Sequence, residues 1–389
     1  MSGRDRLSRW WAVGLLLAVT GLGFWLRWLY ARDVSFFVDE YLTVRAAERI
    51  LAHGVPLLPS GNFYSHGLLL SYLEAPLLAL GIHGRALLRL PVVLLSTATI
   101  PLTYWLGRRA FSRGAGLLAA ALLAVAPEAI LWGGRVRMYG PLQFFVLAAT
   151  VIFYLWVVEE RDRPLYAVLF VLAYWASIFC HAEAMLLLPL WGLWALVQRG
   201  WRWCLRPLHL AAFGLSGLAI VVEILLRRIG PPVQARVAAG VFEPQARQYL
   251  GAGIDWPGVL KVIRPLFLDP LRLPLTLLVL VGLILLLWAV LKVRSNRFSG
   301  ESTAAVEGTA KAVTTNRKLY SYLYLYFLLL PVLFLLLFAV DPEWKSPRYG
   351  LMLLPYFFLL AGTVLAWVGR WLGRRMGLDR PLWRMGATT

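Results

Sequence analysis

Two adjacent carboxylates, Asp39 and Glu40, follow the first long apolar stretch of the chain. Neighbouring residues of a helix point about 100° apart, so these two groups are not expected to hold one ion together. One of them can face a cavity while the other meets an arginine or the start of a helix. The pair is therefore a candidate for proton transfer. The alternative is an acidic cap for a helix over 41–51.

A second group of residues combines arginines with tyrosines. Arg135 and Arg137 lie in one short loop with Tyr139, and Arg348 and Tyr349 precede the last apolar stretch. Guanidinium groups beside the amides of a helix start can hold a phosphate. The alternative is interfacial, with arginines that reach toward lipid head groups and tyrosines that anchor the helix ends. These residues are candidate anion-binding groups.

Weaker candidates for substrate contacts are Tyr64 and His66 in one segment and His181 and Glu183 in another. A histidine beside a glutamate is more often a satisfied polar pair than a ligand. A metal site needs three or four ligands, and the chain has 5 histidines. We therefore expect no bound metal.

The composition of the chain indicates what kind of structure carries these residues. Of the 389 residues, 60% are hydrophobic and 15% are charged, whereas soluble domains have about 25% charged residues. This excludes an ordinary soluble enzyme, a disordered tail and a disulfide scaffold. A net charge of +19 could indicate a protein that binds nucleic acid. Arginine-rich cytoplasmic loops of a membrane protein explain this charge better, so we expect no nucleic-acid partner.

Apolar runs of about 20 residues predict membrane-spanning helices, because backbone polar groups in lipid must be satisfied within the segment. The sequence predicts an all-α polytopic membrane protein of about ten spans, and no separate soluble C-terminal domain is expected within the single domain 1–389. The predicted spans are 10–30, 86–106, 115–132, 139–158, 164–180, 183–198, 207–226, 273–291, 319–340 and 349–368.

The arginines place both termini in the cytoplasm. The first outer loop would cover 31–84, with amphipathic helices over 41–51 and 68–80 that lie at the membrane interface. A second outer loop would cover 227–272, and 292–318 would be a flexible cytoplasmic loop. The candidate carboxylates and arginines then meet at the outer leaflet. There, guanidinium groups can stabilise a departing lipid phosphate while a carboxylate takes a proton from an attacking hydroxyl.

Several motifs, in this order and spacing, resemble one family. They are Phe37–Glu40, Leu88–Pro91, Tyr104–Phe111, Gly116–Ala120 with Pro127, Arg135–Gly140, and Ser346–Tyr349 with Leu354–Pro355. The chain resembles the polytopic GT-C glycosyltransferases that use polyprenyl-phosphate sugars, within them the family 39 and aminoarabinose-transferase-like group, which is similar to the dolichyl-phosphate-mannose protein mannosyltransferases. Two features depart from the family. His66 is followed by glycine and leucine instead of two prolines, and the arginine loop has one residue fewer between its arginines.

The resemblance implies a GT-C bundle in the plasma (inner) membrane with its active site on the outer, periplasmic side. The donor would be a sugar on polyprenyl phosphate, and the acceptor a glycan, lipid or protein. Asp39 would be the catalytic base of an inverting transfer, and Glu40 would support it or contact the acceptor. Arg137 and Arg348, with Arg135, would hold the donor phosphate. No cofactor would be required.

Two other functions stay open at this point. An O-antigen polymerase or ligase would place its key arginines in the second outer loop, at Arg236 or Arg247. A flippase or transporter of lipid-linked sugars would move its substrate without breaking a bond. The sequence does not specify the sugar, the acceptor or the oligomeric state.

Overall fold

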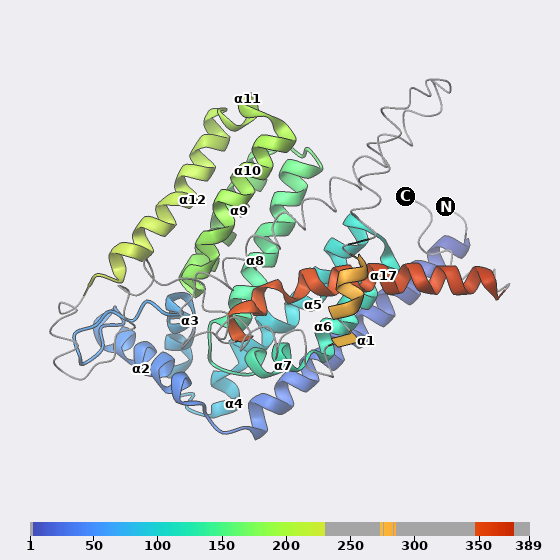
Figure 1. Ribbon diagram of the computed structural model, residues 1–389. Helices are drawn as coiled ribbons and strands as arrows, with labels where there is room; N and C mark the ends of the chain where they lie inside the picture. The colour runs from blue at the N-terminus through green and yellow to red at the C-terminus, as the bar shows by residue number, and fades with distance from the viewer. Residues whose placement is uncertain (1–2, 230–272, 275, 283, 285–346, 377–389) are drawn as a thin grey trace.

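The computed structural model describes residues 3–229, 273–274, 276–282, 284 and 347–376 (Figure 1). Apart from one isolated bridge between Leu57 and Phe63, the regular elements in these ranges are helices. Five of them are long and apolar enough to cross a membrane, and a bent helix pair raises this number to six. A helical membrane fold is thus confirmed for the described ranges, while about ten spans remains a prediction, because 285–291 and 319–340 lie outside the described residues.

The helices in chain order are α1 (Gly3–Asp33), α2 (Val38–His53), α3 (Leu68–Ala79), α4 (Arg85–Leu88), α5 (Leu90–Ala110), α6 (Arg113–Val125), α7 (Pro127–Gly133), α8 (Tyr139–Phe153), η1 (Tyr154–Val158), α9 (Pro164–Cys180), η2 (Ala182–Leu186), α10 (Leu187–Arg199), α11 (Trp201–Cys204), α12 (Pro207–Leu226), η5 (Pro347–Leu353) and α17 (Leu354–Arg375). Of these, η1 is a π-helix, and η2 and η5 are 3₁₀-helices.

Two predicted spans differ from the structure in a way that matters for the site. The predicted span 115–132 is a pair, α6 and α7, bent by 60°. Pro127 causes the break, because it lacks an N–H and forces the preceding residue out of the helical region. The predicted span 183–198 begins as the 3₁₀ turn η2 and becomes α-helical only at Leu187. The span 207–226 has the predicted bounds, with Pro207 at its first position.

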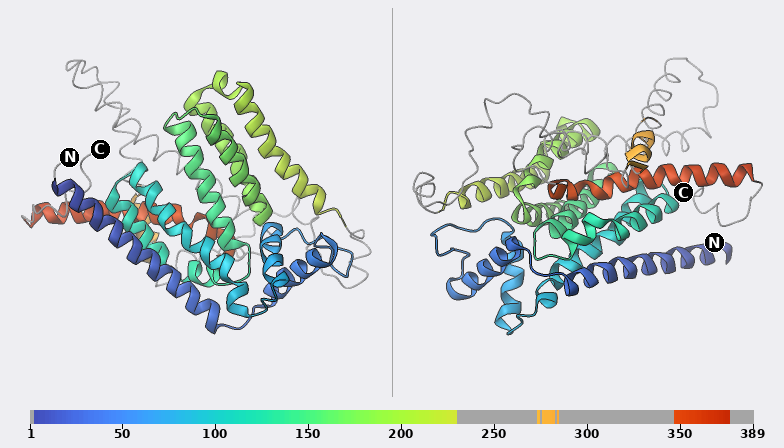
Figure 2. Two further views of the ribbon diagram at one scale, coloured as in Figure 1. Left: turned by 180° about the vertical axis from the view of Figure 1, so that it is seen from behind. Right: turned by 60° about the horizontal axis from the view of Figure 1, so that its bottom comes forward.

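The helices form two neighbouring groups (Figures 1 and 2). In one group, α8 packs against α9, and α9 against α12. In the other group, α6 packs against α5, α17 and α1. Close approach of α5 and α6 requires small residues, because a Cβ on Gly107 would lie 2.6 Å from the Cα of Gly116. Contact between α5 and α8 joins the two groups.

The short helices gather at one end of the bundle, away from α11 (Figure 1). There α2 packs on α3, α3 also contacts α9, and α7 contacts α1, α8 and η5. The amphipathic patterns 41–51 and 68–80 are helices as predicted, namely α2 and α3. This end of the bundle carries the candidate residues of the first outer loop and of the arginine loop.

Candidate active site at the end of the bundle

Glu40 is the more deeply enclosed of the two adjacent carboxylates. Its side chain is fully buried and forms a two-pronged ion pair with Arg89, with 2.8 Å from Nε to Oε1 and 2.7 Å from Nη2 to Oε2. Glu40 also accepts hydrogen bonds from the backbone N–H groups of Phe37, at 2.7 Å, and Val136, at 2.8 Å. Both carboxylate oxygens are therefore engaged by the protein. Glu40 fixes the start of α2 against the arginine loop.

Arg89 extends this network to the end of α1. Its guanidinium donates to the carbonyl oxygens of Ala31, Val34 and Ser35, at 2.8, 2.7 and 3.0 Å. Breaking a buried ion pair of this kind is strongly destabilising, because the remaining charge is left without its partner in a low-dielectric site. Arg89 lies in one of the motifs that resemble the family, but its charge was not singled out as a candidate.

Asp39 points to a different place, although it is the adjacent residue. Its Oδ2 atom lies 3.5 Å from Nη2 of Arg137 and 3.5 Å from Nη1 of Arg348. Charge-assisted hydrogen bonds between such groups are usually about 2.7–2.9 Å long, so both contacts are loose ion pairs. The side chain of Asp39 is 26% exposed. The structure thus brings together one accessible carboxylate and two guanidinium groups from segments that are far apart in the sequence.

Arg137 is held rigidly at this position. Its Nη1 donates to the carbonyl oxygen of Asp39 and to the hydroxyl of Tyr64, both at 3.0 Å, and lies 3.4 Å from the Thr43 hydroxyl. Its Nε is buried and makes no hydrogen bond with the described residues. The predicted substrate contact Tyr64 therefore touches Arg137 directly. It positions the guanidinium group against α2.

Arg135 contacts aromatic side chains. Its Nε donates to the Tyr30 hydroxyl at 2.8 Å, and its guanidinium packs over the rings of Tyr30, Phe37 and Trp132. These aromatic side chains come from α1, the start of α2 and α7, so Arg135 joins the three elements. Arg137, two residues further along, faces Asp39 instead, and a role of Arg135 in holding the donor phosphate stays a prediction.

The ring of Tyr139 packs against the two guanidinium groups that face Asp39. Its buried ring lies 6.0 Å from the guanidinium carbon of Arg137 and 5.7 Å from that of Arg348. Trp132 packs edge-on against Tyr139 and also lies under Arg348. The backbone of Tyr349 belongs to η5, but its side chain lies outside the described residues.

The rings of His66 and His181 extend the aromatic surface of Tyr139, and we call these two rings the histidine wall. The ring of His181 lies 5.9 Å from Tyr139 and 6.2 Å from His66. Desolvation, together with the positive charges of Arg227 and Arg137, lowers the pKa of His66 to about 4. Burial lowers the pKa of His181 well below its usual value. Both rings are therefore uncharged at neutral pH and can exchange hydrogen bonds with neutral groups.

Glu183 is close to His181, as the sequence suggested. The N–H of Glu183 donates to Nδ1 of His181 at 3.3 Å, and Oε2 of Glu183 lies 3.6 Å from the same nitrogen. A neutral His181 that accepts at Nδ1 carries its proton on Nε2. Within the described residues, no three His, Cys, Asp or Glu side chains gather as a metal site.

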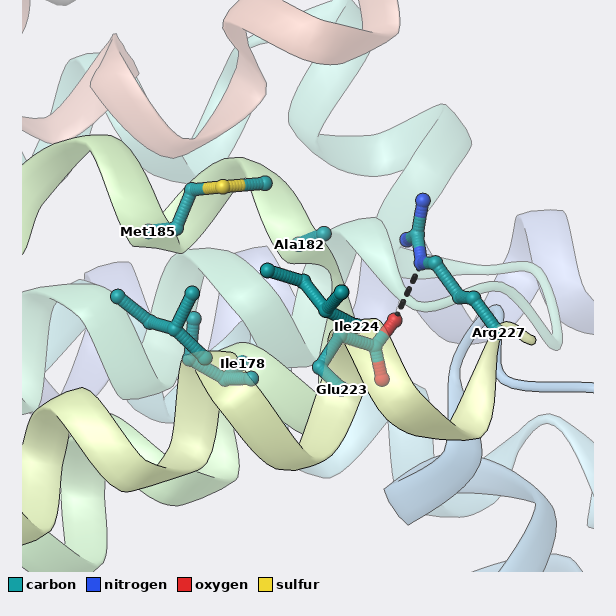
Figure 3. Close-up of a pocket in the computed structure, with 7 residues that line it drawn as sticks. Ile178, Ala182, Met185, Glu223, Ile224 and Arg227 are labelled. Carbon is teal, nitrogen blue, oxygen red and sulfur yellow. Dashed lines mark hydrogen bonds and ion pairs between the residues drawn. The ribbon is translucent and has the colours of Figure 1, made fainter.

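A small cavity of about 70 Å³ borders this region between α9, η2 and α12 (Figure 3). Its walls are mostly apolar, and its polar rim is the pair of Glu223 and Arg227, joined at 2.8 Å. The partner of Glu223, which the sequence did not identify, is thus Arg227, one helical turn away. Arg227 also acts electrostatically on His66 and His181, so the cavity lies near the histidine wall.

Comparisons with known proteins bear on the fold and on the family of the chain. The model of the dolichyl-phosphate-mannose-protein mannosyltransferase family matches residues 65–226. No curated protein sequence matches the chain. Among solved structures, the oligosaccharyltransferase AglB from Archaeoglobus fulgidus, in complex with an inhibitory peptide and a dolichol-phosphate, has a TM-score of 0.60 at 15% identity. That match covers 95% of this chain and 52% of AglB.

A second similar structure is ArnT from Cupriavidus metallidurans bound to undecaprenyl phosphate. Its TM-score is 0.60 at 16% identity, with 94% of this chain and 62% of ArnT covered. This chain therefore spans about half of AglB and less than two thirds of ArnT. At these identities the structures establish the fold, and the family model adds a sequence match over 65–226. The protein thus has the GT-C fold, and its resemblance to the polyprenyl-phosphate-dependent glycosyltransferases is confirmed.

Proposed function

We propose that this protein is a membrane glycosyltransferase that moves a sugar from a polyprenyl-phosphate carrier to an acceptor hydroxyl. The observation that carries the proposal is the position of the Asp39 carboxylate, 3.5 Å from the guanidinium groups of both Arg137 and Arg348. One accessible acid beside two convergent cations suits a reaction in which a hydroxyl loses a proton and a phosphate leaves with the bonding electrons.

Asp39 acts as the general base. It is partly exposed and its contacts with the two arginines are long, so a carboxylate oxygen can accept the proton of an incoming hydroxyl. The hydroxyl oxygen, as it loses its proton, attacks the anomeric carbon from the face opposite the phosphate. This attack inverts the configuration of the sugar. Glu40 cannot replace Asp39 in this step, because Arg89 and two backbone amides occupy its oxygens.

Arg137 and Arg348 bind the phosphate of the donor. Their guanidinium groups come from different segments and meet at Asp39, so an anion beside this carboxylate can contact both. Preorganised cations of this kind stabilise the charge that develops on the leaving group, and removing one such donor typically costs about 3 kcal/mol of the activation free energy. Arg135 supports the loop through its aromatic contacts and is not assigned to the phosphate.

The neutral side chains beside the phosphate site suit a sugar. Tyr64, His66 and His181 lie along one wall, and uncharged imidazoles can donate to or accept from hydroxyl groups without attracting the anion. The similar structures fit this substrate class, since AglB was solved with a dolichol-phosphate and ArnT with undecaprenyl phosphate. We propose that the site opens on the outer side of the plasma membrane, with both termini in the cytoplasm, and that no metal is required.

The decisive experiment measures cleavage of the bond between the sugar and the polyprenyl phosphate. Purified protein in liposomes receives a polyprenyl-phosphate sugar labelled in the sugar, together with a membrane extract as the source of acceptor. Release of free polyprenyl phosphate with transfer of the label is expected, and Asp39→Asn should lower the rate by about 10²–10⁴-fold. Asp33→Asn, in an exposed pair with Arg32, is the matched control and should leave the rate unchanged.

Three outcomes would contradict the proposal. Unchanged turnover in Asp39→Asn would remove this residue from the mechanism. Movement of intact donor across the bilayer without release of polyprenyl phosphate would favour a flippase. Loss of activity on changing Arg236 or Arg247 alone, two positions outside the described residues, would favour a polymerase or ligase.

A further inference from the structure

Arg27 is a charged residue near the C-terminal end of a membrane-spanning helix, and its side chain is completely buried. A buried charge in such a helix is costly unless it is bound by polar partners. The guanidinium of Arg27 has four: the hydroxyl of Ser96, at 2.9 Å, and the carbonyl oxygens of Gly23, Ala124 and Leu123, at 2.9, 3.1 and 3.2 Å. Two of these partners belong to the last turn of α6.

The last turn of α6 needs such a partner because the helix stops there. The final carbonyl groups of a helix have no intrahelical donors, and Pro127 cannot supply a backbone N–H. Arg27 donates to two of these carbonyls, and its positive charge also lies at the negative end of the helix dipole. A side chain from α1 thus caps α6 at the point where the chain bends by 60° into α7.

The same face of α1 also holds the far end of α7. Tyr30, one turn after Arg27, accepts the hydrogen bond from Arg135. Gly133 and Gly134 close α7 in tight contact with this face. A Cβ on Gly134 would lie 2.7 Å from the Tyr30 ring and 3.1 Å from the Arg27 carbonyl oxygen, and a Cβ on Gly133 would collide with Ser96. The path of α7 is therefore fixed at both ends, immediately before the loop that carries Arg137.

We propose that Arg27 is a positioning residue for the reaction centre, because by capping α6 it sets the bend into α7 and so the place of Arg137 opposite Asp39. This inference rests on the proposed function for its kinetic readout. The four hydrogen-bond partners of Arg27 are Ser96 and helix carbonyls, so it acts on the reaction centre through α6 and α7 and not by touching the substrate. A displacement of about 1 Å at a catalytic group can cost about 10²-fold in rate, which is the scale expected when the cap is lost.

The test compares Arg27→Gln, Arg27→Lys and Ser96→Ala with wild type in liposomes. Arg27→Gln should lower kcat by about 10²-fold, raise the KM for the polyprenyl-phosphate sugar and weaken binding of the sugar-free polyprenyl phosphate. Arg27→Lys keeps a cation that can reach a carbonyl, so it should recover part of the activity. Arg32→Gln, on the same helix but in an exposed pair with Asp33, is the matched control and should behave as wild type.

A residue needed only for folding would lower the amount of folded protein and leave the KM and kcat of the folded fraction unchanged. That result for Arg27→Gln would overturn the proposal. If Arg27→Gln does not fold, Arg27→Lys and Ser96→Ala decide: wild-type KM and phosphate affinity in both would overturn it, and a raised KM in either would support it. If Asp39→Asn abolishes transfer while the Arg27 variants are normal, this inference fails and the proposed function stands.

Discussion

Asp39 and Glu40 are adjacent in the chain, but their surroundings differ in burial and in the length of the ion pairs. Around Glu40, every contact is short and buried: the two prongs of the Arg89 pair measure 2.7 and 2.8 Å, and both residues have no exposed side-chain surface. Around Asp39, the two ion pairs measure 3.5 Å and the carboxylate is partly exposed. The first region has its polar groups satisfied by the protein, whereas the second leaves charged groups able to bind a substrate.

The ion pairs at the opposite end of the bundle are nearly as short as that of Glu40, although their side chains are more exposed. Asp162 pairs with Arg206 at 2.7 Å and with His209 at 2.9 Å, and Glu160 pairs with Arg199 at 3.0 Å. Short pairs therefore hold the scaffold at both ends, and charge alone does not mark the site. The Asp39 region differs in that its ion pairs are long, at 3.5 Å, while its arginines are largely buried, with Arg137 and Arg348 only 7% and 20% exposed against 60% for Arg206.

The largest effect on stability is expected for Glu40→Gln. It leaves Arg89 charged in a buried site, which typically costs about 3–5 kcal/mol of unfolding free energy. Thermal unfolding in detergent measures the loss. The double variant Glu40→Met with Arg89→Met removes both charges and should recover much of it. The control is Glu48→Gln, whose pair with Arg45 is exposed. Equal stability of Glu40→Gln and wild type would show that this pair does not hold the two regions together.

A smaller effect, and on activity instead of stability, is expected for Arg137→Ala. The phosphate loses one of two convergent cations, so the efficiency of donor use should fall by about 3 kcal/mol in activation free energy. Donor titrations of the transfer rate measure it. Arg85→Ala, in the short helix α4, tests whether loss of any arginine at this end has the same result. Unchanged kcat/KM in Arg137→Ala would place the phosphate elsewhere.

An effect confined to acid pH is expected from His181. Burial lowers the pKa of this ring well below 6.5, its usual value in an unfolded chain. Between the pKa of the folded protein and 6.5, the unfolded chain therefore binds more protons than the folded protein. Stability from His181 is therefore present above about pH 6.5 and is lost as the pH falls below it. His181→Asn should lose less stability than wild type between pH 7.5 and 5.5 in thermal melts. Parallel melting curves for the two proteins would contradict this.

The smallest effect is expected at the opposite end of the bundle. Arg109 pairs with Glu159 at 3.1 Å while 35% of its side chain is exposed, and surface pairs contribute about 0–1 kcal/mol. Arg109→Gln should therefore change stability by no more than this and leave the transfer rate unchanged. A large loss of activity would mean that the two ends of the bundle are coupled, which would weaken the contrast between scaffold pairs and site pairs.

The sequence predicts the fold better than it predicts the contacts. Apolar length alone gives the span 207–226, because lipid imposes helical structure on such a run. The bend at Pro127 and the 3₁₀ turn before Leu187 depend on local backbone chemistry that a hydropathy pattern averages out. The convergence of Asp39, Arg137 and Arg348 agrees with the geometry expected from the motifs. Their catalytic roles remain proposals.

Other contacts could not be read from one sequence because they join residues far apart in the chain. Glu40 and Arg89 are 49 positions apart, and nothing local distinguishes Arg89 from an arginine at a helix end. Arg135 was grouped with Arg137 by its spacing, yet it faces Tyr30. Arg27 did carry a signal, since it is a charge close to the end of an apolar span, where a partner is needed.

The loop between α7 and α8 shows how two nearby arginines come to face different partners. The N–H of Arg137 donates to the carbonyl oxygen of Arg135 at 2.7 Å, a three-residue turn, while the N–H of Val136 is held by Glu40. The single residue between the two arginines is thus matched to this turn, which directs Arg135 toward Tyr30 and Arg137 toward Asp39. In relatives with one residue more between the two arginines, the loop needs a different turn to bring the second guanidinium to the same carboxylate. Length and turn type should therefore change together in this loop.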